Sequence, residues 1–467
     1  MQLAVRPEDA GMEMPLPVES VAVAPPLRGN QMRKFCLLAA IIPALLAQQP
    51  SDPRELLAKA RDLVIARLMR LSDYVCVQTV DRQYFKYLER VKRLDWSGEQ
   101  FAPPSCAEIA VFDKENPRDR VLQSTDRLRL ELKVSQGTEI GTWAGASQFG
   151  SRSVFDLVGG GTYETGTMGT FLGDIFENGT YHYMGEETAG TIKLAAYGYQ
   201  VPLLSSHYRF KTGSGSTPTA FSGVFWIDSD SLEIRRLRVD ANEMPPETGG
   251  CEATTTVEYQ AVQVGAGEFL LPVRSSMRMV RMDGTETRTT AVYSGCREYR
   301  GEATIRFDDA AAPSDVPAAA APASPLPAGI SFSLALTSPI DTDTAAAGDV
   351  FTARLREAVH ISKEVLVPAG ARVEGRIVQM QHSLIQPRQF TISLMLEKIE
   401  VHGVASPLYA RLSWEAGSTG ISVPPLGQSP LVAALVFTTN NGRHIVRAGY
   451  QTNWVTVAPP PGTGPAL

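Results

Sequence analysis

The chain is poor in the residues that enzymes and metal sites use most. Its 467 residues include five cysteines and six histidines, and the histidines are scattered without the spacing of metal ligands. The sequence contains no G-x-S-x-G, H-E-x-x-H, phosphate-loop or dinucleotide-binding motif. We therefore expect a protein that is not an enzyme and that has no catalytic residues, metal or cofactor.

An excess of either charge is also absent. Lysine and arginine number 44 against 50 aspartates and glutamates, a net charge of −6. This balance does not favour binding to nucleic acid or to an anionic membrane surface. No apolar run approaches the roughly 20 residues that a membrane-spanning helix needs. We expect contact with a membrane to be peripheral at most.

The most informative feature that is present is a short apolar run near the start. Arg33 and Lys34 precede about a dozen apolar residues that end in small side chains at Ala47. This arrangement is typical of a secretory signal peptide, which we place at 32–47. Residues 1–31 lie upstream of it, so we expect translation to begin at Met32; a genuine extended leader is the alternative. The mature protein is then periplasmic or secreted.

Cysteine usage agrees with export. Cys36 lies inside the signal, which leaves Cys76, Cys106, Cys251 and Cys296. An even number in an exported chain predicts two disulfides. Three pairings exist, and we favour the two local ones, Cys76–Cys106 and Cys251–Cys296. A zinc site is a weaker alternative, because the cysteines are isolated from one another.

An Ala/Pro-rich segment divides the rest of the chain. Residues 309–328 have no periodic apolar face and predict an extended linker. We therefore expect two domains, at 51–308 and 329–458, followed by a disordered tail at 459–467.

The first domain opens with a helix signal and continues with strand signals. Asp52-Pro53 and Glu55 predict a capped N-terminus, and apolar residues at spacings of three and four follow. Apolar and polar residues then alternate, as in Leu128–Val134, and the slip at Arg235-Arg236 predicts a bulge. The predicted fold is mainly β (α+β), with an N-terminal helix, a curved antiparallel half-barrel and a small barrel-like second domain. The expected strands lie at 74–80, 128–134, 232–239, 254–259, 269–273, 276–282 and 304–307, with a turn at Asp283-Gly284, and in the second domain at 350–355, 364–370, 371–378 and 390–396.

Aromatic residues are set among glycines between positions 140 and 180. This composition predicts an apolar lid over a cavity, or alternatively a loop whose aromatic rings fill the core of a curved sheet. The hypothetical ligand-binding residues are Trp143, Phe149, Phe155, Phe171 and Phe176.

Several segments of the first domain resemble a known superfamily. The first strand carries Tyr-x-x-x-Gln-Thr from Tyr74, and Gly223–Arg236 reads G-V-F-W-I-D-S-D-S-L-E-I-R-R. Together with a later strand that ends in Leu271-Pro272, these resemble the periplasmic lipoprotein carriers that sort outer-membrane lipoproteins. The resemblance covers about half of the domain. It implies a curved sheet around helices, with an apolar cavity for acyl chains. The proposed disulfides and the Gly/aromatic insertion depart from that pattern.

The second domain resembles a different family. Val365–Gly375 is similar to a strand, turn and strand in the barrel domain of secretion-channel proteins that span the bacterial envelope, and Asp341–Asp349 is similar to the segment before it. This resemblance implies packing against another protein. The whole chain resembles exported two-domain proteins of soil bacteria to which no activity is assigned.

Three functions remain open at this point. The first is an exported, non-enzymatic binding protein that holds a lipid or lipoprotein acyl chain in the first domain. The second is a structural or protein-interaction module of the cell envelope without a small-molecule ligand, whose protein partner docks on the second domain. The third is a hydrolase. Ser205-Ser206-His207 offers hydroxyls beside an imidazole, but neighbours on a strand point to opposite faces. Asp341 and Asp343 supply too few oxygens for calcium.

Overall fold

The computed structural model describes most of the chain after the predicted signal. The described residues are 52–69, 74–87, 105–115, 120–135, 138–146, 149, 166–212, 215–241, 244–265, 267–299, 325–361, 363–401 and 403–460, with breaks at 414–420, 423–428, 430 and 441. Residues Ser51–Leu467 belong to one compact unit. The predicted leader and signal peptide, Phe155, the strand expected at 304–307 and most of the linker and tail lie outside the described residues.

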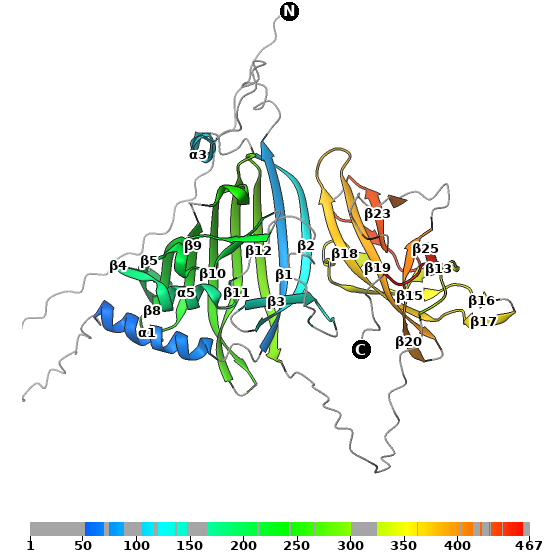
Figure 1. The fold of residues 1–467 in the computed structure, drawn as a ribbon, viewed down its shortest axis with the longest axis horizontal. Coiled ribbons are helices and arrows are strands. Elements are labelled where there is room, and N and C mark those ends of the chain that lie inside the picture. Colours follow the sequence, from blue (N-terminus) through cyan, green and yellow to red (C-terminus); the bar gives the residue numbers. More distant parts are fainter. Residues whose placement is uncertain are drawn as a thin grey trace, which may run out of the picture. The chain divides into compact units, whose positions relative to one another are not determined.

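The fold is mainly β, as the alternation of apolar and polar residues predicted. In the N-terminal part, long strands lie side by side in one antiparallel sheet (Figure 1) with the order β4-β5-β8-β9-β10-β11-β12-β1-β2-β3. Their bounds are β1 Tyr74–Tyr87, β2 Arg120–Ser135, β3 Thr138–Trp143, β4 Thr180–Ala189, β5 Ile192–Val201, β8 Phe221–Asp228, β9 Ile234–Ala241, β10 Gly250–Val264, β11 Gly267–Arg281 and β12 Glu286–Glu298; β6 Arg209–Thr212 and β7 Gly215–Pro218 form a separate hairpin.

Two helices pack on the inner face of this sheet. Helix α1 (Pro53–Leu68) starts at Asp52, whose side chain accepts a hydrogen bond from the Arg54 backbone N–H at 2.9 Å. Glu55, expected to complete a capping box, forms an ion pair with Lys59 instead. Helix α5 (Thr170–Asn178) and α1 share one apolar core with strands β5, β8, β9, β10 and β11. A third helix, α3 (Cys106–Glu115), packs through Ile109 against Val280 of β11.

Local predictions in the sheet were largely correct. Asp283-Gly284 forms the turn between β11 and β12, where Gly284 has a φ of +74°. The slip between β8 and β9 leaves Arg235 as the extra residue, which confirms the predicted bulge. The two strands expected at 269–273 and 276–282 are one strand, β11. A register shift opposite Glu258 and Tyr259 absorbs the break in the pattern.

The C-terminal part is also built of antiparallel strands around its own apolar core. The strands expected at 350–355, 364–370, 371–378 and 390–396 are present as β15, β17, β18 and β19, and Trp454 on β25 is fully buried among them. The bounds are β13 Ser331–Leu336, β14 Ile340–Asp341, β15 Val350–Leu355, β16 Val359–Ile361, β17 Glu364–Val367, β18 Arg372–Ser383, β19 Gln389–Val401, β20 Val404–Pro407, β21 Ala410–Leu412, β22 Ile421–Ser422, β23 Val432–Thr438, β24 Ile445–Val446 and β25 Gln451–Thr456.

Strand β2 has backbone partners along its outer edge. Residues 130–135 pair with β3, and residues 124–126 pair with 381–383 of β18. Between them, Ala347 donates to the carbonyl of Arg127 and accepts from the N–H of Arg129, at 2.8 and 2.6 Å. Gly348, with a φ of +109°, passes so close that a Cβ would collide with the Arg129 carbonyl. This edge of the sheet is therefore covered.

Both expected disulfides are present, but the local pairing was wrong. Cys76 on β1 bonds to Cys296 on β12, and Cys106 on α3 bonds to Cys251 on β10. The reason is topological. Strand β1 lies beside β12, the last strand of the meander, so Cys76 meets a cysteine 220 residues away in sequence.

Candidate ligand-binding face

The structure separates the aromatic residues predicted to line a cavity. Trp143 ends β3 and is half-buried against the apolar cluster that contains Leu128, Leu130 and Met168. Phe149 packs edge-to-face on Tyr299 at 5.7 Å, with the Lys133 ammonium 4.9 Å from its ring. Neither side chain belongs to the apolar core that α5 shares with the sheet.

Phe171 and Phe176 lie together on α5, inside the core. Phe171 packs edge-to-face against Tyr208 at 4.9 Å, and Phe176 contacts Phe225 at 5.3 Å. Both side chains are buried. Residues 170–178 form a helix because their apolar side chains recur at helical spacing, whereas the glycine-rich residues 150–165 lie outside the described residues.

The size of the side chains on the inner face of the sheet changes from β9 to β12. Near α5 it carries large residues, whereas the middle of β10, β11 and β12 carries small ones. Thr255, Ser275 and Thr289 are 0%, 1% and 3% exposed. They alternate with Val257, Met277 and Ala291 on the same buried face, and Thr255 and Thr289 both lie opposite Met277.

None of these three hydroxyl groups has a hydrogen-bond partner among the described residues. The oxygens of Thr255, Ser275 and Thr289 are fully shielded and unpaired. A buried polar group without a partner costs about 1–3 kcal/mol, so three on adjacent strands form an unusual concentration of unmet bonding capacity. Such a face can receive the polar group of a bound molecule only when the side chains that shield it move aside.

We call Thr255, Ser275 and Thr289 the hydroxyl patch. An ion pair on β1 lies beside it. Arg82, opposite Thr289, donates two hydrogen bonds of 2.7 Å to the carboxylate of Asp126, and Tyr84 donates a third at 3.0 Å. Burial, together with the Asp126 charge, raises the pKa of Tyr84, so its hydroxyl stays protonated. The hydroxyl patch therefore ends at this ion pair.

A network of hydrogen bonds holds Thr167, which lies in the segment that leads into α5. Thr167 shares a 2.6 Å hydrogen bond with the Tyr293 hydroxyl, to which Gln78 donates at 2.8 Å. Tyr259 donates to the Thr167 carbonyl at 2.9 Å. Three strands, β1, β10 and β12, thereby fix the position of Thr167.

Glu139 holds the next residue and is electrostatically unusual. Its Oε1 accepts from the Met168 backbone N–H at 2.5 Å, whereas its Oε2 is shielded and unpaired. Burial raises the pKa of Glu139 to about 7, against the lowering effect of the backbone bonds. The hydroxyl of Tyr74 is likewise unpaired, and burial and the Glu139 charge raise its pKa.

The Ser205-Ser206-His207 segment does not assemble a nucleophile and a base. The His207 Nδ1 lies 2.5 Å from Asp174 Oδ1, and its backbone N–H donates to Asp174 Oδ2 at 2.7 Å. Ser206 Oγ accepts from the Tyr208 backbone N–H instead of facing the imidazole. This arrangement anchors the turn to α5.

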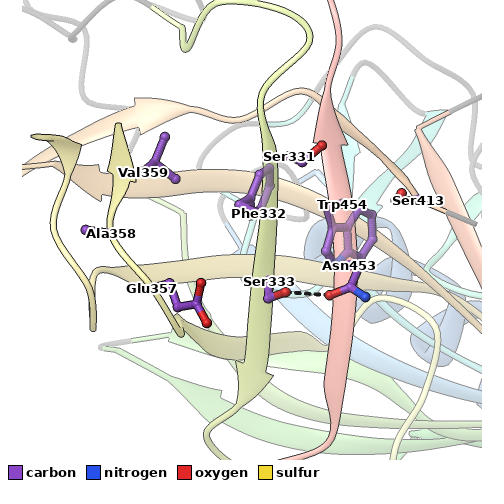
Figure 2. A pocket seen from close by; sticks show the side chains of 9 residues that line it. All are labelled: Ser331, Phe332, Ser333, Glu357, Ala358, Val359, Ser413, Asn453 and Trp454. Carbon is purple, nitrogen blue, oxygen red and sulfur yellow. Dashed lines mark hydrogen bonds between the residues drawn. The ribbon is translucent and has the colours of Figure 1, made fainter. Parts of the chain in front are cut away.

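A separate depression lies in the C-terminal part, between β13, β25 and residues 357–359 (Figure 2). Its volume is about 200 Å³. Ser333 donates to Asn453 Oδ1 at 2.5 Å across its floor, and Glu357 stands exposed at its rim. Its described lining contains no buried polar atom that lacks a partner. We therefore give the inner face of the N-terminal sheet more weight.

The described residues contain neither a helix long and apolar enough to cross a membrane nor a group of three potential metal ligands.

Sequence reasoning missed the hydroxyl patch and Glu139. A signal for the former existed, because Thr255 and Ser275 occupy apolar positions in alternating strands. Only the pairing of β10, β11 and β12 shows that these residues are neighbours.

Comparison with known proteins finds weak likenesses only. No family model and no curated protein matches the chain. Among solved structures, a LolA superfamily protein from Nitrosomonas europaea is 12% identical, with 54% of this chain and 95% of that chain covered and a TM-score of 0.25. A putative outer membrane lipoprotein-sorting protein domain from Vibrio parahaemolyticus is 10% identical, with 53% and 95% covered and a TM-score of 0.26. A DUF1329 family protein from Desulfovibrio piger is 12% identical, with 54% and 96% covered and a TM-score of 0.23. Scores of this size carry no argument, so function is inferred below from the chain's own residues.

Proposed function

We propose that this protein is an exported, non-enzymatic binding protein whose inner sheet face holds an amphiphilic ligand such as a lipid or lipoprotein acyl chain. The observation that carries the proposal is the set of three shielded, unpaired hydroxyls of Thr255, Ser275 and Thr289. A polar group of the ligand would bond to them, and its apolar chain would lie along the neighbouring apolar side chains.

The composition of the surrounding face supports this ligand class. Met277 and Met279 lie on β11 beside the hydroxyl groups and belong to the apolar core. Methionine is flexible and adapts to irregular apolar partners. Ala253, Ser275 and Ala291 add small side chains to the same face on three adjacent strands. A flexible chain suits such a surface better than a rigid polar metabolite does.

The test is native mass spectrometry of the full chain purified from a periplasm, followed by organic extraction and lipid analysis. We expect a co-purifying amphiphile in the natural protein. Ser275→Phe should displace it by filling the face, while the matched Ser276→Phe should not, because Ser276 points to the exposed face. A protein that carries no lipid and takes up none when lipid is added would overturn the proposal.

A further inference from the structure

The two long edges of the N-terminal sheet differ in whether other described strands pair with them. The outer edge of β2 is covered by β3, Ala347 and β18. At the other end of the sheet, β4 pairs with β5, and no other described strand pairs with it. A free strand edge presents unpaired N–H and C=O groups that can bond to another strand.

Strand β4 is also exposed on both faces. Tyr181 and Gly185 are half-buried, and every other residue of the strand is exposed. Tyr183 and Met184 are 44% and 56% exposed, and Ile192 at the start of β5, opposite Ala189, is also exposed. This edge therefore offers apolar side chains as well as backbone groups.

Common protective features are scarce on β4. Its ten residues include no Lys, Arg or Pro, the residues that often block pairing at a sheet edge. Two protective features are present: the glutamates at 186 and 187, and a bulge at which Met184 is the extra residue opposite Tyr197 and Ala196. The bulge leaves Met184 pointing outward.

We propose that two copies of this chain associate through β4, edge to edge and antiparallel. Centred between Tyr183 and Met184, this pairing sets Met184 of each copy opposite Tyr183 of the other. Both charged side chains of β4, Glu186 and Glu187, lie in its C-terminal half. In the antiparallel arrangement they fall opposite Tyr181 and Thr180, whereas a parallel in-register pairing would bring the glutamates together.

The partner is thus a second copy, because antiparallel self-pairing sets Met184 against Tyr183 and keeps the glutamates of the two copies apart. A single strand pair buries less surface than a standard protein interface, so the association is a concentration-dependent equilibrium. It uses a different part of the sheet from the proposed ligand face, because β5, β8 and β9 separate β4 from β10, the nearest strand of the hydroxyl patch.

Sedimentation velocity on the full chain over a concentration series tests the proposal. We expect a reversible monomer–dimer equilibrium that Met184→Lys, and separately Tyr183→Lys, weakens about tenfold or more. Leu204→Lys is the matched control, since Leu204 is 100% exposed in a short 3₁₀ turn away from the edge.

Hydrogen exchange locates the contact independently of the variants. Amides of β4 should exchange more slowly in the dimer than in the monomer, while those of β6 and β7 should not change. A protein that stays monomeric up to its solubility limit would overturn the proposal. A dimer that both lysine variants leave intact, or one that leaves β4 exchange unchanged, would do so as well.

Discussion

Cys76 and Cys296 join β1 to β12 through a disulfide, with their Cα atoms 4.0 Å apart and a sequence separation of 220. The second bond, Cys106–Cys251, encloses 145 residues and lies wholly inside the first loop. The two bridges are therefore nested: one ties β1 to β12, the last strand of the meander, and the other ties α3 to the start of β10.

This nesting predicts a specific peptide map. Digestion without reduction should release Cys76 linked to Cys296 and Cys106 linked to Cys251. Replacing Cys76 and Cys296 together by serine should lower the free energy of unfolding by about 4–5 kcal/mol in the chain-entropy model. Urea denaturation of the double variant measures the loss. Recovery of a Cys76–Cys106 peptide would contradict the pairing.

The unpaired hydroxyls predict an unusual gain of stability. Thr289→Val and Thr255→Val keep the shape of the side chain and remove a buried group that bonds to nothing. Each should stabilise the ligand-free protein by about 1 kcal/mol, yet weaken retention of the amphiphile. Thermal unfolding of delipidated protein and lipid analysis give the two readings. Thr290→Val on the other face is the control, and a loss of stability in Thr289→Val would show that its hydroxyl is satisfied.

Glu139 predicts a pH dependence of stability. Burial raises its pKa to about 7 from the ordinary 4.5, so the folded state favours the protonated form. Its stabilising contribution is complete below pH 4.5 and is lost as the pH rises through 7, about 3 kcal/mol for a shift of this size.

Glu139→Gln, which stays neutral at every pH, should remove this dependence. Denaturation midpoints of both proteins between pH 4 and about 8.5 supply the comparison. The difference between the two proteins should grow as pH rises. Parallel pH profiles would mean that Glu139 keeps an ordinary pKa.

Replacement of Arg376 on β18 should strongly lower the free energy of unfolding. Arg376 is 4% exposed and bonds to the carboxylate of Glu397 at 2.7 Å and to the carbonyls of Gly348 and Ala144 at 2.6 and 2.8 Å. Arg376→Met should lower the free energy of unfolding by about 3 kcal/mol, because it leaves these acceptors without a donor. Arg372→Met on the same strand removes an exposed pair with Glu374 and should cost below about 0.5 kcal/mol. Urea denaturation distinguishes them, and equal losses would contradict the assignment.

Local chemistry made much of the fold predictable. Asp52-Pro53 set the start of α1, and alternation set β2, β9 and β10. Asp283-Gly284 set one hairpin, and the paired arginines set one bulge. Each of these features depends on residues a few positions apart, so the sequence carries the whole cause.

The candidate site was less predictable. Phe171 and Phe176 were identified as apolar and grouped, but their burial in a helix depends on strands β5 and β8, which follow later in the chain. Thr255, Ser275 and Thr289 look like ordinary strand residues until β10, β11 and β12 pair in register.

The sequence by itself determined the mainly β class, the first helix, the turns and the presence of two disulfides, because these follow from short-range periodicity, capping and cysteine number. Only the tertiary structure decided which cysteines pair, which hydroxyls are left unbonded, why the pKa of Glu139 is raised and which edge of the sheet is covered. Those properties depend on which strands become neighbours, and strand neighbours here are separated by up to hundreds of residues.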